Sequence, residues 1–131
     1  MTDQVIATKK VLLVDDDEVI RALMKLFLTG FGSFEYWEEG NGQGALNLAR
    51  QIVPDIILVD LAMPVMDGTQ FTREIRKDSN EKLTKTPIIV ITGGGEEAKT
   101  LAYEAGANMV LEKPLAKKLL ITALRRVLIV K

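Results

Sequence analysis

The chain has 131 residues, of which 47% are hydrophobic, and its 17 basic and 18 acidic side chains leave a formal net charge of −1. This length fits one domain around a hydrophobic core, and the balanced charge argues against direct binding of nucleic acid. The chain contains no cysteine and no histidine, which excludes disulfides, thiolate or imidazole catalysis, and any bound metal other than a hard cation held by oxygen.

Short apolar runs alternate with amphipathic patterns along the chain. Three runs, at 11–14, 56–59 and 88–91, are continuously apolar and end in a polar residue, as strands buried on both faces of a parallel sheet do. The segment 34–37 alternates in polarity, which is typical of an edge strand. The segment 108–112 predicts a fifth strand.

Five helices are predicted from apolar residues that recur at helical spacing. Gly30 and Gly106 follow the first and fourth of them as stop signals, and the polar segment 78–86 is predicted to be a surface loop. The residues that mark the five helices are, in order, Val19, Ile20, Leu23, Met24, Phe27 and Leu28; Ala45, Leu48, Ala49 and Ile52; Phe71 and Ile75; Ala98, Leu101, Ala102 and Ala105; and Leu115, Leu119, Leu120, Ala123, Leu124, Val127 and Leu128.

Strict alternation of strands and helices predicts an α/β fold, a doubly wound parallel sheet with helices on both faces. We find no repeat or linker, so residues 1–131 are expected to form a single domain with a core of about 10–128. No apolar run is long enough for a membrane span or a signal peptide, so we expect a soluble, cytoplasmic protein without membrane contact. In such a sheet, ligands bind at the carboxyl ends of the strands.

Polar side chains gather at those strand ends. Carboxylates about 4 Å apart repel by ~4 kcal/mol at an effective dielectric near 20, so clustered acids raise a pKa or bind a cation. Mg²⁺ is the cation that oxygen ligands of this kind favour. An aspartate beside the ion can act as a nucleophile toward a phosphoryl group. A hydroxyl and an ammonium can bind the oxygens of that phosphoryl group. The candidates are Asp15, Asp16 and Asp17 after the first strand, Asp60 after the third, Thr92 after the fourth and Lys113 after the fifth.

Four segments resemble the receiver domains of two-component response regulators, the CheY-like family. They are VLLVDDDEVIR from Val11, DIILVDLAMPVMDG from Asp55, PIIVIT from Pro87 and EKP from Glu112. The resemblance extends over nearly the whole chain. It implies a flavodoxin-like sheet of five strands in the order 2-1-3-4-5, with five helices.

The resemblance implies that Asp60 is the phosphoacceptor of a phosphorelay. Thr92 would bond a phosphoryl oxygen and Lys113 would pair with Asp60 or with its phosphoryl group. The protein would be a signalling switch and not an enzyme, although it would assist its own phosphorylation and dephosphorylation. A cis peptide bond is expected between Lys113 and Pro114, and Gly68 is expected to permit the turn before the third helix.

The resemblance also implies a Mg²⁺ site. Asp16, Asp60 and the main-chain carbonyl of Ala62 would ligate the ion directly, and Asp15 would act mostly through a metal-bound water. Asp17 is expected to cap the first helix and not to bind metal.

Three features depart from the family pattern. Val110 stands three residues before the lysine, where the family usually carries an aromatic that swings inward when the threonine moves. Thr92 is followed by the glycines 93–95, which predict a mobile loop. Two positions that the family uses to tune phosphoryl lifetime are occupied by the small residues Ala62 and Gly94.

Two other functions fit part of the sequence. A haloacid-dehalogenase-like phosphatase would use Asp15 as its nucleophile, but no acidic residue follows Pro114 to supply its last motif, and Asp60 would be unexplained. An unphosphorylated, receiver-like docking module is compatible with Val110, whereas the complete set of acids, threonine and lysine argues against it.

We therefore expect a stand-alone receiver, beginning at Met1, that takes its phosphoryl group from a sensor histidine kinase or a histidine phosphotransfer protein. A downstream protein would bind the face formed by the fourth helix, fifth strand and fifth helix, without direct contact to nucleic acid. Lys99, Lys117 and Lys118 would give that face a local basic character if they lie on it, although they are equally explained as solvated surface charges. The apolar run 127–130 is compatible with a monomer or a weak homodimer.

Overall fold

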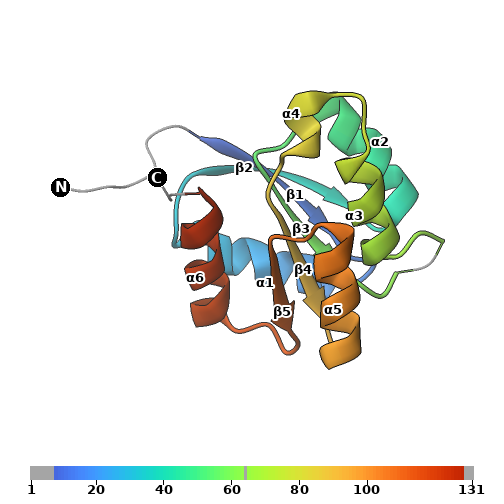
Figure 1. Ribbon diagram of the computed structural model, residues 1–131. Helices are drawn as coiled ribbons and strands as arrows, with labels where there is room; N and C mark the ends of the chain where they lie inside the picture. The colour runs from blue at the N-terminus through green and yellow to red at the C-terminus, as the bar shows by residue number, and fades with distance from the viewer. Residues whose placement is uncertain (1–7, 64, 129–131) are drawn as a thin grey trace.

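The computed structural model describes residues 8–63 and 65–128 and shows one sheet with helices on both faces (Figure 1). All strand pairs are parallel, and the order β2-β1-β3-β4-β5 confirms the prediction. Consequently, the carboxyl ends of all five strands lie at one edge of the sheet. The elements in chain order are β1 (Lys9–Val14), α1 (Glu18–Thr29), β2 (Phe34–Glu39), α2 (Gly42–Ile52), β3 (Ile56–Asp60), α3 (Gly68–Arg76), α4 (Glu81–Thr84), β4 (Ile88–Thr92), α5 (Glu96–Ala105), β5 (Met109–Glu112) and α6 (Lys117–Leu128).

Each face of the sheet packs against its own set of helices. In β1, Leu12 and Val14 belong to the cluster that includes residues of α2, α3 and α5, whereas Val11 and Leu13 pack with α1 and α6. Every residue of β3 and β4 is buried, which explains their uninterrupted apolar sequences. β2 is an edge strand with no fully buried residue, as its alternating sequence predicts.

Polar caps fix where several helices begin. Asp17 caps α1 as predicted, because its side chain accepts a hydrogen bond from an amide of the first turn, and Asn41 and Asp67 cap α2 and α3 in the same way. Gly30 and Gly106 end α1 and α5, as their positions indicate. These local signals determine where the helices begin and end, and therefore which residues form the loops that connect them to the strands.

The number and bounds of the helices differ from the prediction. The described residues contain six helices, because the segment 78–86 includes the one-turn helix α4 in place of a continuous loop. Asn80 caps α4 by accepting from two backbone amides, and Leu83 is buried against the core. α6 begins only at Lys117, so Leu115 lies before the helix, although it still packs against the core.

Some apolar residues on the predicted helix faces do not reach the core. Val19, Leu101 and Leu119 are exposed, because the strip of each helix that contacts the sheet is narrower than its apolar pattern. The first two residues of the run 127–130 pack against the core, and the other two lie outside the described residues. Within the described ranges, no helix has the length and apolar character that a membrane crossing needs.

The two leucines Leu26 and Leu28 of α1 test how far this packing determines stability. Leu28 is 0% exposed and Leu26 is 67% exposed. We expect Leu28→Ala to lower the free energy of unfolding by about 2–5 kcal/mol, since it leaves a cavity, and Leu26→Ala to change it by no more than about 0.5 kcal/mol. Urea unfolding followed by circular dichroism measures both. Equal effects of the two substitutions would contradict the position of α1.

Candidate functional site

Three carboxylates lie together at the carboxyl edge of the sheet. Asp15 and Asp16 follow β1, and Asp60 ends the neighbouring strand β3. Each supplies an oxygen atom, and these oxygens lie within 4.8 Å of one another. Asp15 and Asp60 are buried, whereas Asp16 is exposed, so this acid cluster presents one side to solvent.

The environment of Asp15 favours its neutral form. Burial is the main cause that raises the pKa of Asp15 from 3.8 to about 6, and the nearby carboxylates of Asp60 and Asp16 add to it. The Asp17 amide opposes this by donating to Asp15 Oδ1 at 2.8 Å. Asp15 Oδ2 is buried and has no hydrogen-bond partner among residues 8–63 and 65–128. A cation would satisfy this oxygen, which is otherwise costly to bury.

Lys113 supplies the positive charge beside Asp60. Its Nζ lies 2.8 Å from Asp60 Oδ1, an ion pair that is not well aligned as a hydrogen bond. Burial lowers the pKa of Lys113, but its contact with Asp60 and the attraction of Asp15 and Asp16 outweigh this effect and raise the pKa overall. The peptide bond between Lys113 and Pro114 is cis, as expected.

Thr92 ends β4, the strand next to β3, and its side chain is 2% exposed. Its Oγ1 accepts a hydrogen bond from the Gly94 amide at 2.9 Å, and its carbonyl accepts one from the Lys113 amide at 2.8 Å. A Cβ atom at Gly94 would lie 2.8 Å from the Cβ of Ala98 and 3.2 Å from Thr92 Oγ1. At Gly94 the loop after Thr92 therefore passes too close to Ala98 of α5 to admit a side chain without a shift.

The loop after Asp60 returns closely to the strand end. The Gly68 amide donates to the Leu61 carbonyl at 2.8 Å, and a Cβ at Gly68 would lie 2.6 Å from the Asp60 carbonyl oxygen. The φ of Gly68 is not positive, so this glycine permits the turn before α3 by leaving room for the Asp60 carbonyl and not by adopting a left-handed conformation. Ala62 is exposed in this loop, and a metal-ligand role for its carbonyl stays a prediction.

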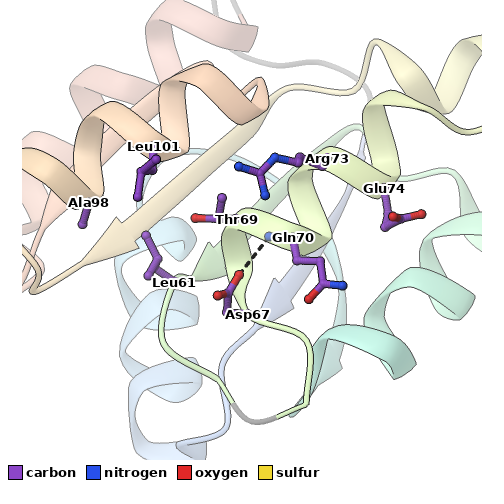
Figure 2. Close-up of a pocket in the computed structure, with 8 residues that line it drawn as sticks. All are labelled: Leu61, Asp67, Thr69, Gln70, Arg73, Glu74, Ala98 and Leu101. Atoms are coloured by element: carbon purple, nitrogen blue, oxygen red, sulfur yellow. Dashed lines mark hydrogen bonds between the residues drawn. The ribbon is translucent and has the colours of Figure 1, made fainter.

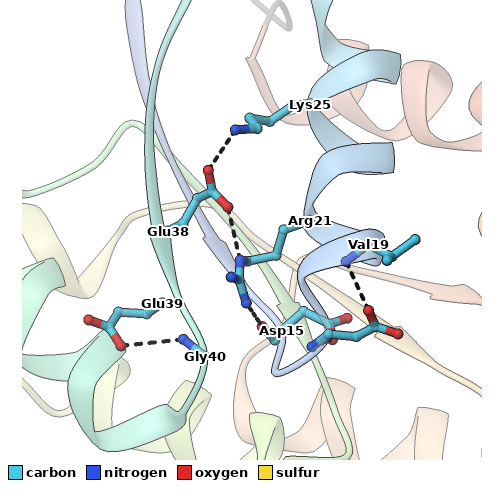
Figure 3. Close-up of polar contacts among 8 residues, drawn as sticks. Asp15, Val19, Arg21, Lys25, Glu38, Glu39 and Gly40 are labelled. Carbon is cyan, nitrogen blue, oxygen red and sulfur yellow. Dashed lines mark hydrogen bonds and ion pairs between the residues drawn. The ribbon is translucent and has the colours of Figure 1, made fainter.

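Two contacts near the site were not predicted from the sequence. The Val110 amide donates to the hydroxyl of Tyr103 at 3.1 Å, which links β5 to α5. The guanidinium of Arg21 donates to the main-chain carbonyl of Asp15 (Figure 3). No sequence pattern indicates the second contact, because it joins a side chain of α1 to a main-chain carbonyl.

A separate groove of about 520 Å³ lies between α3 and α5 (Figure 2). No member of the acid cluster lines it among the described residues, and neither Thr92 nor Lys113 does. Asp67 at its edge is the cap of α3 and accepts from the Gln70 amide at 2.8 Å. The groove thus adjoins the candidate site without forming part of it. Its lining residues are Leu61, Asp67, Thr69, Gln70, Arg73, Glu74, Ala98 and Leu101.

The fold agrees with comparisons to known proteins. A sequence model of the response regulator receiver domain matches residues 11–125. The chain belongs to this family. Receiver domains are the signalling switches of two-component systems, so the family favours the receiver interpretation over the phosphatase.

Individual relatives agree with this assignment. The transcriptional regulatory protein SrrA of Staphylococcus aureus is 38% identical over 112 residues, which are 85% of this chain but only 44% of SrrA. The chemotaxis protein CheY4 of Vibrio cholerae is 35% identical with a TM-score of 0.83, covering 93% of this chain and 100% of CheY4. The receiver domain of the sensor histidine kinase PA1611 of Pseudomonas aeruginosa, with a magnesium ion coordinated in its active site cleft, is 31% identical with a TM-score of 0.81, covering 92% of this chain and 98% of that domain.

The raised pKa of Asp15 predicts how the receiver's stability depends on pH in metal-free buffer. Between about pH 4 and pH 6 the unfolded chain loses the Asp15 proton while the folded domain keeps it, so the free energy of unfolding contributed by this group falls as pH rises. Asp15→Asn should remove this loss. We expect the variant to exceed the wild type by about 1–2 kcal/mol near pH 7, allowing for solvent screening, and to match it below about pH 4.

Urea unfolding at several pH values with a chelator present measures this difference. Glu104→Gln, at an exposed position of α5, serves as the control for removing a carboxylate charge and should follow the wild type. A stability gain at neutral pH that persists unchanged in acid would contradict the titration of Asp15.

Proposed function

We propose that this receiver accepts a phosphoryl group on Asp60 from a phosphohistidine of a sensor histidine kinase or a histidine phosphotransfer protein. One observation carries the proposal: the buried Asp60 carboxylate lies between two other carboxylates, within 4.8 Å, and the Lys113 ammonium at 2.8 Å. The 131 residues contain no histidine, so the donor imidazole belongs to another chain or segment. As such a switch, the domain would act in the cytoplasm.

The acid cluster fits Mg²⁺. All its ligand atoms are oxygens, and Asp15 Oδ2 is buried without a partner among the described atoms. Asp16, Asp60 and the Ala62 carbonyl would hold the ion directly, and Asp15 would hold it through water. When bound, the ion would offset the negative charge of the carboxylates and of the incoming phosphoryl group. The magnesium ion in the related PA1611 receiver supports this assignment.

The transfer itself requires little from the chain beyond positioning. An Asp60 carboxylate oxygen forms the new bond to phosphorus in line with the breaking P–N bond of the donor, whose electron pair stays on the nitrogen. With a proton on its other ring nitrogen, the donor imidazole leaves as a neutral ring. The Lys113 ammonium and the Thr92 hydroxyl bind phosphoryl oxygens as negative charge shifts onto them. Lys113 is held beside Asp60 before transfer, so its positive charge needs little rearrangement.

The signal would leave the site through Thr92. Its hydroxyl now accepts from the Gly94 amide, and turning toward a phosphoryl oxygen would change that bond and shift the loop 93–95. Since α5 follows this loop directly, phosphorylation would shift an equilibrium between two positions of α5. Val110 replaces the usual aromatic of the relay, and the bond between its amide and Tyr103 gives β5 another contact with the moving helix.

The α5–β5–α6 face is the proposed readout surface for a downstream protein. Tyr103 and Leu119 are large apolar residues exposed on these helices. Lys99 contributes little net positive charge there, because its Nζ lies 3.3 Å from Glu96 and 3.5 Å from Glu112.

SrrA is a transcriptional regulator more than twice the length of the matched segment, so an effect on transcription would act through a partner or through residues beyond this domain. We propose a monomer or weak homodimer.

The phosphorylation site is tested with acetyl phosphate and Mg²⁺ as the phosphoryl source. Intact-protein mass spectrometry should show one labile phosphoryl adduct on the wild type, dependent on Mg²⁺ and absent in Asp60→Asn. Asp17→Asn is the matched control: asparagine caps a helix as well as aspartate does, so that variant should still form the adduct.

Other results would point to the alternatives. Phosphate release that survives Asp60→Asn but is lost in Asp15→Asn would indicate a phosphatase. The absence of any adduct, together with failure to bind beryllofluoride, would indicate a docking module that is never phosphorylated.

Mg²⁺ binding should depend on pH because Asp15 must lose its proton first. With a pKa of about 6 for Asp15, we expect the affinity to be nearly constant above about pH 7 and to fall by roughly tenfold per pH unit well below pH 6. Isothermal titration calorimetry across this range measures the change. In Asp15→Asn the affinity should be lower at neutral pH and much less dependent on pH; a wild-type affinity that stays constant through pH 5 would contradict this coupling.

A further inference from the structure

Arg21 connects three elements around the loop that carries the acid pair (Figure 3). From its place on α1, its Nε donates to Glu38 Oε1 of β2 at 2.9 Å, and its Nη1 donates to the main-chain carbonyl of Asp15. The Arg21 side chain is only 17% exposed. A single planar guanidinium therefore fixes the loop against both a helix and the edge strand.

The carbonyl that Arg21 holds belongs to the peptide bond between Asp15 and Asp16. The other groups of Asp15 are also held: its amide donates to the Glu39 carbonyl at 3.1 Å, and its Oδ1 accepts from the Asp17 amide at 2.8 Å. The Asp15–Asp16 peptide joins these held groups to the exposed Asp16, so a rotation of this peptide would turn the two carboxylates relative to each other. The bond from Arg21 to the carbonyl of this peptide restrains that rotation.

Glu38 in turn holds Arg21 in place. Its second oxygen accepts from Lys25 Nζ at 2.7 Å, and the hydrogen bonds from Lys25 and then Arg21 lower the pKa of Glu38. Lys25 is 40% exposed and makes no hydrogen bond or ion pair with the acid loop among the described residues, so it shares the ion-pair network but not the carbonyl contact. An exposed ion pair by itself contributes little to the free energy of unfolding. The directional bond to the Asp15 carbonyl is what distinguishes Arg21.

We propose that Arg21 is a positioning residue of the metal site, whose bond to the Asp15 carbonyl orients Asp15 and Asp16 and thereby sets the affinity for Mg²⁺. The inference rests on the proposed function in that it takes Mg²⁺ as the ion of the acid cluster. Arg21 touches neither the ion nor the phosphoryl group. It acts through the backbone on the residues that do.

The test compares Arg21→Lys with Lys25→Gln in the unphosphorylated protein. Lysine keeps the positive charge but cannot reach Glu38 and the carbonyl with one rigid fork, so we expect Mg²⁺ to bind roughly tenfold more weakly, as is usual when a residue behind a metal ligand is lost. Lys25→Gln removes a charge from the same network and should leave the affinity within about twofold. Titration with Mg²⁺ alone, followed by the backbone amide signals in NMR spectra, gives each dissociation constant.

Stability and a third variant separate positioning from simple bracing. Thermal unfolding in the presence of a chelator shows whether each variant is folded. Glu38→Gln removes one partner of Arg21 without changing α1, so its affinity for Mg²⁺ should lie between those of the wild type and Arg21→Lys. If Arg21→Lys lowers the melting temperature but binds Mg²⁺ as the wild type does, Arg21 is only a brace and the inference is overturned. Equal losses in Arg21→Lys and Lys25→Gln would assign the effect to the ion-pair network that both residues share at Glu38 and not to the bond with the Asp15 carbonyl, which would overturn the inference too. Failure of the wild type itself to bind Mg²⁺ would overturn the proposed function, and this inference with it.

Discussion

Carboxylate oxygens of Asp15, Asp16 and Asp60 lie within 4.8 Å of one another, and two like unit charges at that distance repel by roughly 3–4 kcal/mol at an effective dielectric near 20. An unfolded chain would keep these groups apart. The fold brings them together because β1 and β3 are neighbours whose apolar residues are buried, and a fully buried aliphatic side chain contributes about 1.5–3 kcal/mol. The hydrophobic core thus stabilises a sheet edge that electrostatics alone would open.

The repulsion is offset by one group from a distant part of the chain and by one from the acid loop itself. Lys113, after β5, pairs with Asp60, and the Asp17 amide at the start of α1 donates to Asp15. These contacts do not compensate all of the negative charge and burial at the site. The pKa of Asp15 is therefore raised, and one of its carboxylate oxygens has no partner among the described residues. A cation and a phosphoryl group have complementary needs, since the cation requires oxygen ligands and the phosphoryl group requires reduced negative charge and a nearby ammonium. The same imbalance therefore explains both the metal site and the acceptor site that we propose.

The features that the sequence predicts correctly are those set by local pattern. Continuous apolar runs identify β3 and β4, alternation identifies the edge strand β2, and polar residues before apolar stripes identify caps such as Asp17. The helix α4 is missed because its four residues are too few for helical periodicity to show. The reason for Gly68 and the contact of Arg21 are missed because both depend on atoms that approach only after the sheet has formed. The site residues could be named from strand ends and family resemblance, but their roles need measurement.

The two halves of the site differ in how firmly they are held. On the acid side, Asp15 is bonded through its amide, its carbonyl and one carboxylate oxygen, and Asp60 lies in a fully buried strand. On the other side, Thr92 leads into the glycines 93–95, all exposed, and Gly95 has a positive φ of 85°. Glycine has the greatest backbone freedom, and elements that move in a switch come from the parts of a fold with the fewest buried contacts. Thr92 itself ends a fully buried strand, so the difference lies in the loops that follow the strands: the acid loop is held by several hydrogen bonds, whereas the glycine loop that leads directly into α5 is exposed. In the switch that we propose, a new group on Asp60 would therefore displace the loop after Thr92 more readily than the acid loop.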